Sequence, residues 1–152
     1  MKRLIAITLA LLMLACTALG ALAQSDAPDR TIDTFYVSRM IEGGFASYSI
    51  TADGGEYRVS VDDGPEQPFG ADAVGELMNA IEKYDIAAWD GFSASDNIVE
   101  DGEYFRLEIG FTDGTGIVAR GENAFPDNYD VAMAEIWRIL TWNAEDAADE
   151  HV

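Results

Sequence analysis

Carboxylates are almost the only side chains of this chain that could do chemistry. The 152 residues include 28 Asp and Glu but only one His and one Cys. The histidine, His151, is the penultimate residue, and a chain end cannot hold an imidazole beside fixed catalytic partners. A Ser-His-Asp triad and a histidine-rich metal site are therefore not expected. Paired carboxylates remain, and a glycosidase-type hydrolase needs two of them at a defined separation in a cleft.

An acidic, turn-rich segment between Asp90 and Glu103 is the best candidate for a metal site. It also contains Asp96 and the run Glu100-Asp101-Gly102. Calcium binds several oxygen ligands, and loops of this composition supply them. Ile98, however, occupies a position where an EF-hand loop needs an oxygen donor. Because Asp-Gly pairs also form ordinary turns, we expect no catalytic residue, no metal and no cofactor, with structural calcium as the alternative.

The charge balance excludes some classes of partner. Nine basic residues against 28 acidic ones give the whole chain a formal net charge of −19. Such a surface repels phosphate backbones and anionic lipid head groups. Nucleic-acid binding is therefore not expected, whereas a cationic protein would fit this charge. The sequence leaves the identity of the partner unknown.

The first 23 residues have the pattern of a secretory signal peptide. Lys2 and Arg3 precede a long apolar run, and Ala21 and Ala23 are the small residues that a leader peptidase reads. Cleavage before Gln24 would release a protein that is secreted or works at the cell envelope, with no membrane span. This mature chain would lack cysteine, so no disulfide could stabilise it. Its formal net charge would be −21, because two of the nine basic residues are lost.

Two other fates of this segment stay open. Met13-Leu14-Ala15-Cys16 resembles a lipobox, in which Cys16 would be lipidated and become the first residue. Met13 and Leu14 depart from the leucine and the small residue that are usual in that motif. In the third fate the segment is not cleaved, since about 19 apolar residues can just span a bilayer.

The hydrophobic pattern divides the chain into a leader at residues 24–33, a single domain at 34–142 and an acidic tail at 143–152. Within the domain, alternation and turn residues predict strands over residues 34–41, 45–52, 56–62, 103–111 and 115–120. Helical spacing predicts one helix over residues 72–84, with Asp72 as its N-cap, and another over 128–142. Residues 93–100 are expected to form a polar loop.

This βββ-α-ββ-α order predicts an α+β fold, an antiparallel sheet of about five strands with two helices packed on one face. The other face would stay open to solvent, lined by Arg58, Tyr104, Arg106, Glu108 and several serines and threonines. Among the aromatic residues, Tyr104 and Trp142 are expected to be exposed. Exposed aromatics beside arginine would suit a recognition patch.

The turn at Asp113-Gly114 decides which residues of the last strand are buried. A two-residue turn would align Val118 and Arg120 with the face that carries Phe105. A three-residue loop with a glycine bulge would align Ile117 and Ala119 instead. We expect the bulged loop, because the other register turns the Arg120 charge toward the core.

A succession of short motifs in the second half carries a family resemblance. The motifs are Trp89-Asp90-Gly91-Phe92, Asp101-Gly102-Glu103-Tyr104-Phe105, Asp113-Gly114 and Phe125-Pro126-Asp127-Asn128-Tyr129. In this order they resemble an uncharacterised domain of secreted proteins and lipoproteins of Firmicutes-type bacteria. The resemblance implies export and a similar fold, but no activity.

The physical role expected for these motif residues is structural. Trp89 and Phe92 can wedge between helix and sheet beside Phe105, and Gly91 permits the turn that follows Trp89. Pro126 starts the last helix next to Tyr129. We therefore expect a non-enzymatic binding or interaction module. The alternatives are an acidic inhibitor of a cationic extracellular enzyme and a carboxylate-dependent envelope hydrolase.

Overall fold

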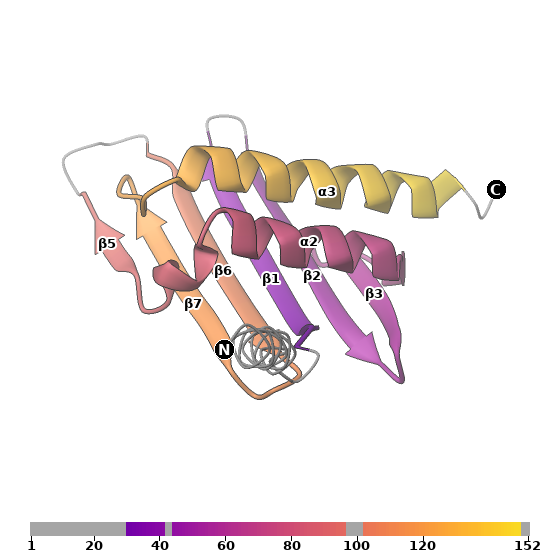
Figure 1. Ribbon diagram of the computed structural model, residues 1–152. Coiled ribbons are helices and arrows are strands. Elements are labelled where there is room, and N and C mark those ends of the chain that lie inside the picture. The colour runs from indigo at the N-terminus through magenta and orange to yellow at the C-terminus, as the bar shows by residue number, and fades with distance from the viewer. Residues whose placement is uncertain (1–29, 42–43, 97–101, 150–152) are drawn as a thin grey trace, which may run out of the picture.

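A seven-stranded sheet is the frame of the protein, and two helices cover one of its faces (Figure 1). The computed structural model describes residues 30–41, 44–96 and 102–149. The strands are β1 (Ile32–Ile41), β2 (Gly44–Asp53), β3 (Glu56–Val61), β4 (Gln67–Phe69), β5 (Ser93–Ser95), β6 (Tyr104–Phe111) and β7 (Gly116–Glu122). The expected signal peptide, the Cys16 lipidation site and the cleavage site before Gln24 lie outside the described residues.

The strand order in the sheet is β4-β3-β2-β1-β6-β7-β5. All neighbouring strands are antiparallel except β5, which pairs in parallel with β7. The α+β class and the two helices on one face are thus confirmed. The prediction of an antiparallel sheet of about five strands is wrong in two respects, because β4 and β5 add a strand at either edge and the parallel pairing of β5 makes the sheet mixed. Ser93–Ser95 belongs to β5 and is therefore not part of a polar loop.

The first helix, α2, spans Ala71–Lys83 and begins after Gly70. The N-cap position is occupied by Gly70, so the prediction that Asp72 is the N-cap is wrong. Asp72 lies in the first turn instead, where a carboxylate interacts favourably with the positive end of the helix dipole. A short 3₁₀ helix, η1 (Ile86–Trp89), follows α2.

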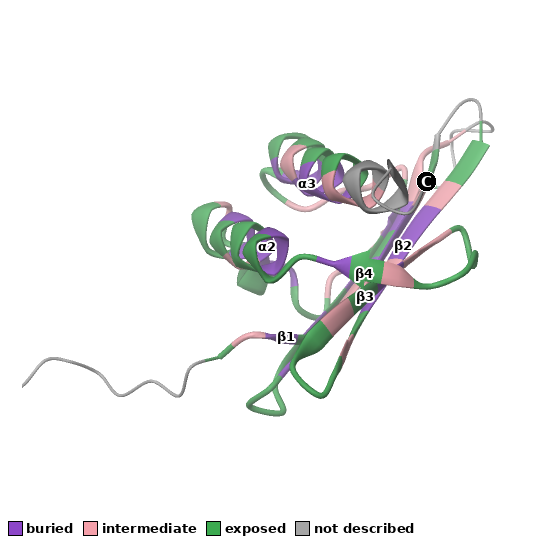
Figure 2. Ribbon diagram, turned by 90° about the vertical axis from the view of Figure 1, so that its right-hand side faces the viewer, coloured by how far each residue is buried: buried purple, intermediate pink, exposed green. Residues whose placement is uncertain are grey.

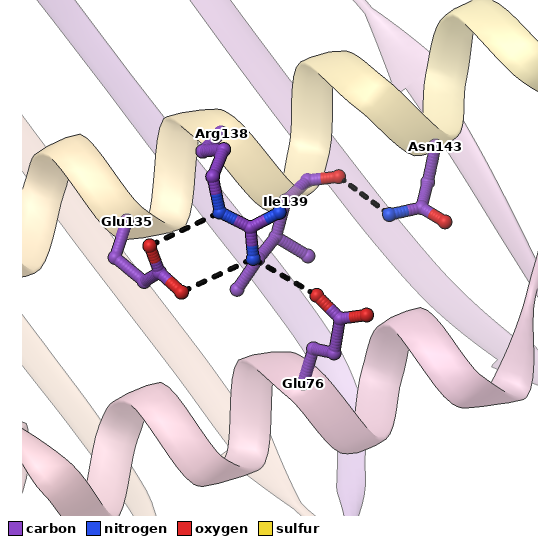
Figure 3. Close-up of polar contacts among 5 residues, drawn as sticks. All are labelled: Glu76, Glu135, Arg138, Ile139 and Asn143. Carbon is purple, nitrogen blue, oxygen red and sulfur yellow. Dashed lines mark hydrogen bonds and ion pairs between the residues drawn. The ribbon is translucent and has the colours of Figure 1, made fainter.

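The last helix, α3, spans Tyr129–Asp149 and continues seven residues beyond its predicted end at Trp142. Neither described helix is long and apolar enough to cross a membrane. α3 is linked to α2 on the outer surface by Arg138, whose guanidinium bonds Glu135 of its own helix and Glu76 of α2 (Figure 3). These three side chains are solvent-exposed or nearly so, so the link contributes little to stability.

The hydrophobic core lies between the sheet and the two helices (Figure 2). Both helices turn their buried residues toward the sheet, and neither of them lies on the other face, which we call the open face. The β6–β7 hairpin has the expected bulged register, in which Ala119 faces Leu107 and Ile117 faces Ile109. Gly114 takes the positive φ of 81° that the three-residue loop requires.

Candidate functional site

The motif residues of the second half gather around the ring of Phe105. The ring centroid of Phe105 lies 4.7 Å from Tyr129, 5.8 Å from Phe125, 6.2 Å from Phe92 and 6.4 Å from Trp89. These rings come from η1 and the turn after it, from β6, and from the segment that leads into α3, so the cluster ties three separate segments together. We call these five residues the aromatic cluster.

Polar contacts fix the turn that holds the cluster. The indole Nε1 of Trp89 donates to the backbone carbonyl of Asp127 at 3.1 Å. Gly91, with φ 77°, donates its N–H to the carbonyl of Val118, and the N–H of Val118 donates to Oδ1 of Asp90. Both the carbonyl and the N–H of Val118 in β7 therefore hold the turn that follows η1.

Tyr129 combines a buried ring with a strongly shifted pKa. Its hydroxyl donates to Oε1 of Glu103 at 3.1 Å. Burial, followed by the negative charge of Glu103, raises the pKa of Tyr129 far above its ordinary value near 10. The phenol therefore stays protonated at any physiological pH and serves as a hydrogen-bond donor.

A pocket of about 400 Å³ lies beside the aromatic cluster. We call it the acidic pocket because two exposed carboxylates, Asp85 and Asp127, stand among its walls. The other residues that line it are Tyr84, Ala88, Trp89, Phe92, Phe125, Pro126 and Asn128. Carboxylates next to aromatic rings suit a cationic group.

The segment considered for calcium is only partly described, because residues 97–101 lie outside the described residues. Asp90 already accepts the backbone N–H of Val118. Across the described ranges, no group of three or more His, Cys, Asp and Glu is placed to hold a metal ion. Calcium binding by the whole segment stays a prediction.

The open face of the sheet is a second candidate surface. Cross-strand pairs arrange its side chains in rows that cross β2, β1 and β6. One row joins Phe45, Met40 and Tyr104, the next Ser47, Ser38 and Arg106, the third Ser49, Tyr36 and Glu108, and the fourth Thr51, Thr34 and Gly110. β3 extends the fourth row with Arg58, and β7 extends the first three with Glu122, Arg120 and Val118.

Large apolar side chains are exposed on this face. Phe45 and Val118 are each 54% exposed and Met40 is 48% exposed. The only other large hydrophobic side chains of the described residues with such exposure are Val131 and Trp142, both on α3. The open face therefore combines exposed apolar, aromatic and arginine side chains.

Near one edge of the open face, a second pocket of about 350 Å³ lies along β5, β6 and β7. Two arginines, Arg106 and Arg120, and two carboxylates, Asp90 and Glu108, line it, together with Gly91, Phe92, Ser93, Tyr104, Val118 and Ala119. We call it the arginine pocket. The guanidinium of Arg106 is hydrogen-bonded to Glu108, and Nε of Arg120 donates to the hydroxyl of Ser93 at 3.0 Å.

The predicted site residues within the described ranges lie in or beside the aromatic cluster, on α3 or on the open face. Trp89, Phe92, Phe105 and Tyr129 lie in the aromatic cluster, and Gly91 and Pro126 flank it. Of the two aromatics expected to be exposed, Trp142 is 66% exposed on α3 and Tyr104 is half-buried on the open face.

The sequence analysis did not single out Met40 and Phe45. The signal was present, because alternation from Tyr36 and Ser49 assigns both side chains to the open face.

Comparison of the chain with protein-family models, with curated proteins and with solved structures gives no match.

Proposed function

We propose that this protein is an exported, non-catalytic binding module that docks a protein partner on the open face of its sheet. The observation that carries the proposal is the composition of that face. It combines Phe45, Met40, two tyrosines and three arginines. Aromatic residues, methionine and arginine are the types enriched at protein–protein interfaces, whereas acidic residues are depleted there.

The charge distribution supports the same face. In the four rows defined above there are three arginines and two glutamates, although the chain beyond residue 23 has a net charge of −21. A partner with an apolar centre and carboxylates around it would complement this face. The acidic remainder of the surface would keep nucleic acids and anionic lipids away.

The N-terminal sequence supports a location outside the cytoplasm. A basic start, an apolar run and small residues at Ala21 and Ala23 are the features that export requires. The motif resemblance to secreted proteins and lipoproteins points the same way. The partner would accordingly be another protein of the envelope or the surroundings.

The experiment compares two double variants as baits in native envelope extracts. Met40→Ser with Phe45→Ser removes the exposed apolar side chains of the open face. Val131→Ser with Trp142→Ser removes side chains of similar exposure from α3 and serves as the control. We expect the first variant to lose the protein captured by the wild type and the second to retain it.

Two results would overturn the proposal. Retention of the captured protein by the open-face variant would show that binding occurs elsewhere. A wild-type dimer that the same variant dissociates, seen by analytical ultracentrifugation, would make the partner a second copy. Thermal melts of both variants check that each still folds.

The acidic pocket favours a second candidate, an acidic inhibitor of a cationic extracellular enzyme. A lysine or arginine side chain of such an enzyme could enter between Asp85 and Asp127 against the aromatic walls. The test is binding to lysozyme by the wild type and by Asp85→Asn with Asp127→Asn. Binding that disappears at moderate salt, or that the variant retains, would indicate non-specific charge attraction.

A further inference from the structure

Arg106 and Arg120 occupy directly opposite positions on neighbouring antiparallel strands, so both side chains lie on the open face. Like charges in such a cross-strand pair destabilise a sheet. The chain has only seven basic residues beyond residue 23, yet two of them share this pair. Glu108 pairs with Arg106 and relieves this repulsion, but both guanidinium groups still line one pocket.

The two guanidinium groups are not equivalent. Arg106 donates from both Nε and Nη2 to one carboxylate oxygen of Glu108, which neutralises its charge. Arg120 has no ion pair with a carboxylate among the residues that the structure describes. Its Nε donates to the hydroxyl of Ser93, which orients the guanidinium beside the pocket that Arg120 lines.

The walls of the arginine pocket indicate what the rest of the ligand resembles. Phe92 and Tyr104 offer partly exposed aromatic rings, and Val118 is 54% exposed. A planar guanidinium matches the two oxygens of a carboxylate. The strongly negative chain would repel a doubly charged phosphate more than a singly charged carboxylate.

We propose that the arginine pocket binds a carboxylate attached to an apolar or aromatic group, such as the C-terminal residue of a protein or peptide. Arg120 holds the carboxylate, and Val118 with the aromatic walls contacts the apolar part. This inference rests on the proposed function, because it names the group of the partner that the open face recognises.

The test uses N-acetyl-phenylalanine as the probe and N-acetyl-phenylalanine amide as its uncharged control. Each is titrated into the ¹⁵N-labelled exported protein, and the Arg120 Nε–H and the Val118 amide resonances are followed by NMR. We expect saturable shifts with the acid, with a dissociation constant on the order of 1 mM, and no saturable shift with the amide. Equal responses to the two compounds would overturn carboxylate recognition.

Three variants test the assignment of residues. Arg120→Gln should abolish the response, while Arg58→Gln, which removes an arginine from the same face outside the pocket, should not change it. Glu108→Gln should tighten binding about five-fold, because it frees Arg106 and removes a competing negative charge. Binding retained by Arg120→Gln would overturn the proposal. Unchanged affinity in Glu108→Gln would show that Arg106 does not contribute to carboxylate binding.

Failure here is distinguishable from failure of the proposed function. An absent probe response, with capture still dependent on Phe45 and Met40, would overturn the carboxylate site alone. A specific probe response, with capture independent of those two residues, would overturn docking on the open face and leave the pocket standing.

Discussion

The indole Nε1 of Trp89 donates a 3.1 Å hydrogen bond to the backbone carbonyl of Asp127. Trp89 is 3% exposed and lies in η1, whereas Asp127 comes just before α3. One side chain thus joins two motifs that are 38 residues apart. The aromatic cluster depends on this joint, because the rings of Phe125 and Tyr129 belong to the segment that it holds.

Replacing Trp89 by alanine should lower the free energy of unfolding by about 3–5 kcal/mol, because a buried aromatic side chain leaves a cavity. Trp89→Phe should cost less, since it keeps a ring and loses the hydrogen bond. Urea denaturation measures both. Trp142→Ala is the matched control, and at 66% exposure it should change stability by no more than about 0.5 kcal/mol. Equal stabilities of Trp89→Ala and the wild type would contradict the buried placement.

Two glycine-to-alanine substitutions should change the free energy of unfolding in opposite directions. At Gly121 an added Cβ would lie 2.0 Å from the carbonyl oxygen of Ala124 and 2.6 Å from the ring of Phe105. Gly121→Ala should therefore destabilise by about 1–3 kcal/mol. At Gly75 in α2 an added Cβ would meet nothing within 4 Å apart from its chain neighbours and the nearby backbone of its own helix, so Gly75→Ala should stabilise by about 0.5–1 kcal/mol through helix propensity. Thermal or urea denaturation of the two variants measures the difference.

Stability should fall above about pH 10 through Tyr129. Its pKa is raised in the folded state, so above its ordinary value near 10 the unfolded chain loses the proton while the folded chain keeps it. The buried phenol contributes its full stabilisation below pH 10. As the pH rises above that value, the free energy of unfolding falls by up to about 1.4 kcal/mol per pH unit. Urea denaturation at increasing pH should give a steeper decline for the wild type than for Tyr129→Phe. Parallel declines would contradict the buried phenol.

The link between α2 and α3 at Arg138 should matter only at low salt. The hydrogen bond from Arg138 lowers the pKa of Glu135 below the ordinary glutamate value of 4.5. The stabilisation by this ion pair is therefore present above pH 4.5 and disappears as the pH falls through the lowered pKa. Arg138→Ala should lower the melting temperature slightly at neutral pH. The difference should vanish in about 1 M salt, where the Debye length is about 3 Å. A difference that persists in high salt would point to packing by the arginine stem.

The mass of the protein recovered from its native host should identify its N-terminus. Cleavage before Gln24 predicts a chain without cysteine and without lipid. Intact-mass spectrometry of the protein recovered from its native host distinguishes this form from one that begins at a lipidated Cys16. A lipid-modified mass would contradict release and would place the binding face at a membrane surface.

The long elements were predictable because each shows its period several times. Phe105, Leu107 and Ile109 alternate with polar residues over β6, and their burial in the structure agrees. β4 and β5 have only three residues each, too few for alternation to be recognised. β5 exists because the turn after η1 brings Ser93 beside Arg120, which is a tertiary event.

Two further differences have physical causes. The alanine- and glutamate-containing segment after Trp142 has high helix propensity, a signal that could have extended the predicted helix. The open face was predicted with Tyr104 and Arg106, whereas the pairing of Met40 with Phe45 depends on the register of the β1–β2 hairpin.

Both margins of the sheet end in very short strands, and β4 also contains Pro68, which has no N–H to donate. Neither margin offers a long row of free backbone groups to another chain. Addition of strands from neighbouring copies, the usual route to fibrils, is thereby blocked at each end. The protein can consequently leave the broad side of its sheet without a covering helix and still not polymerise through the borders of that sheet.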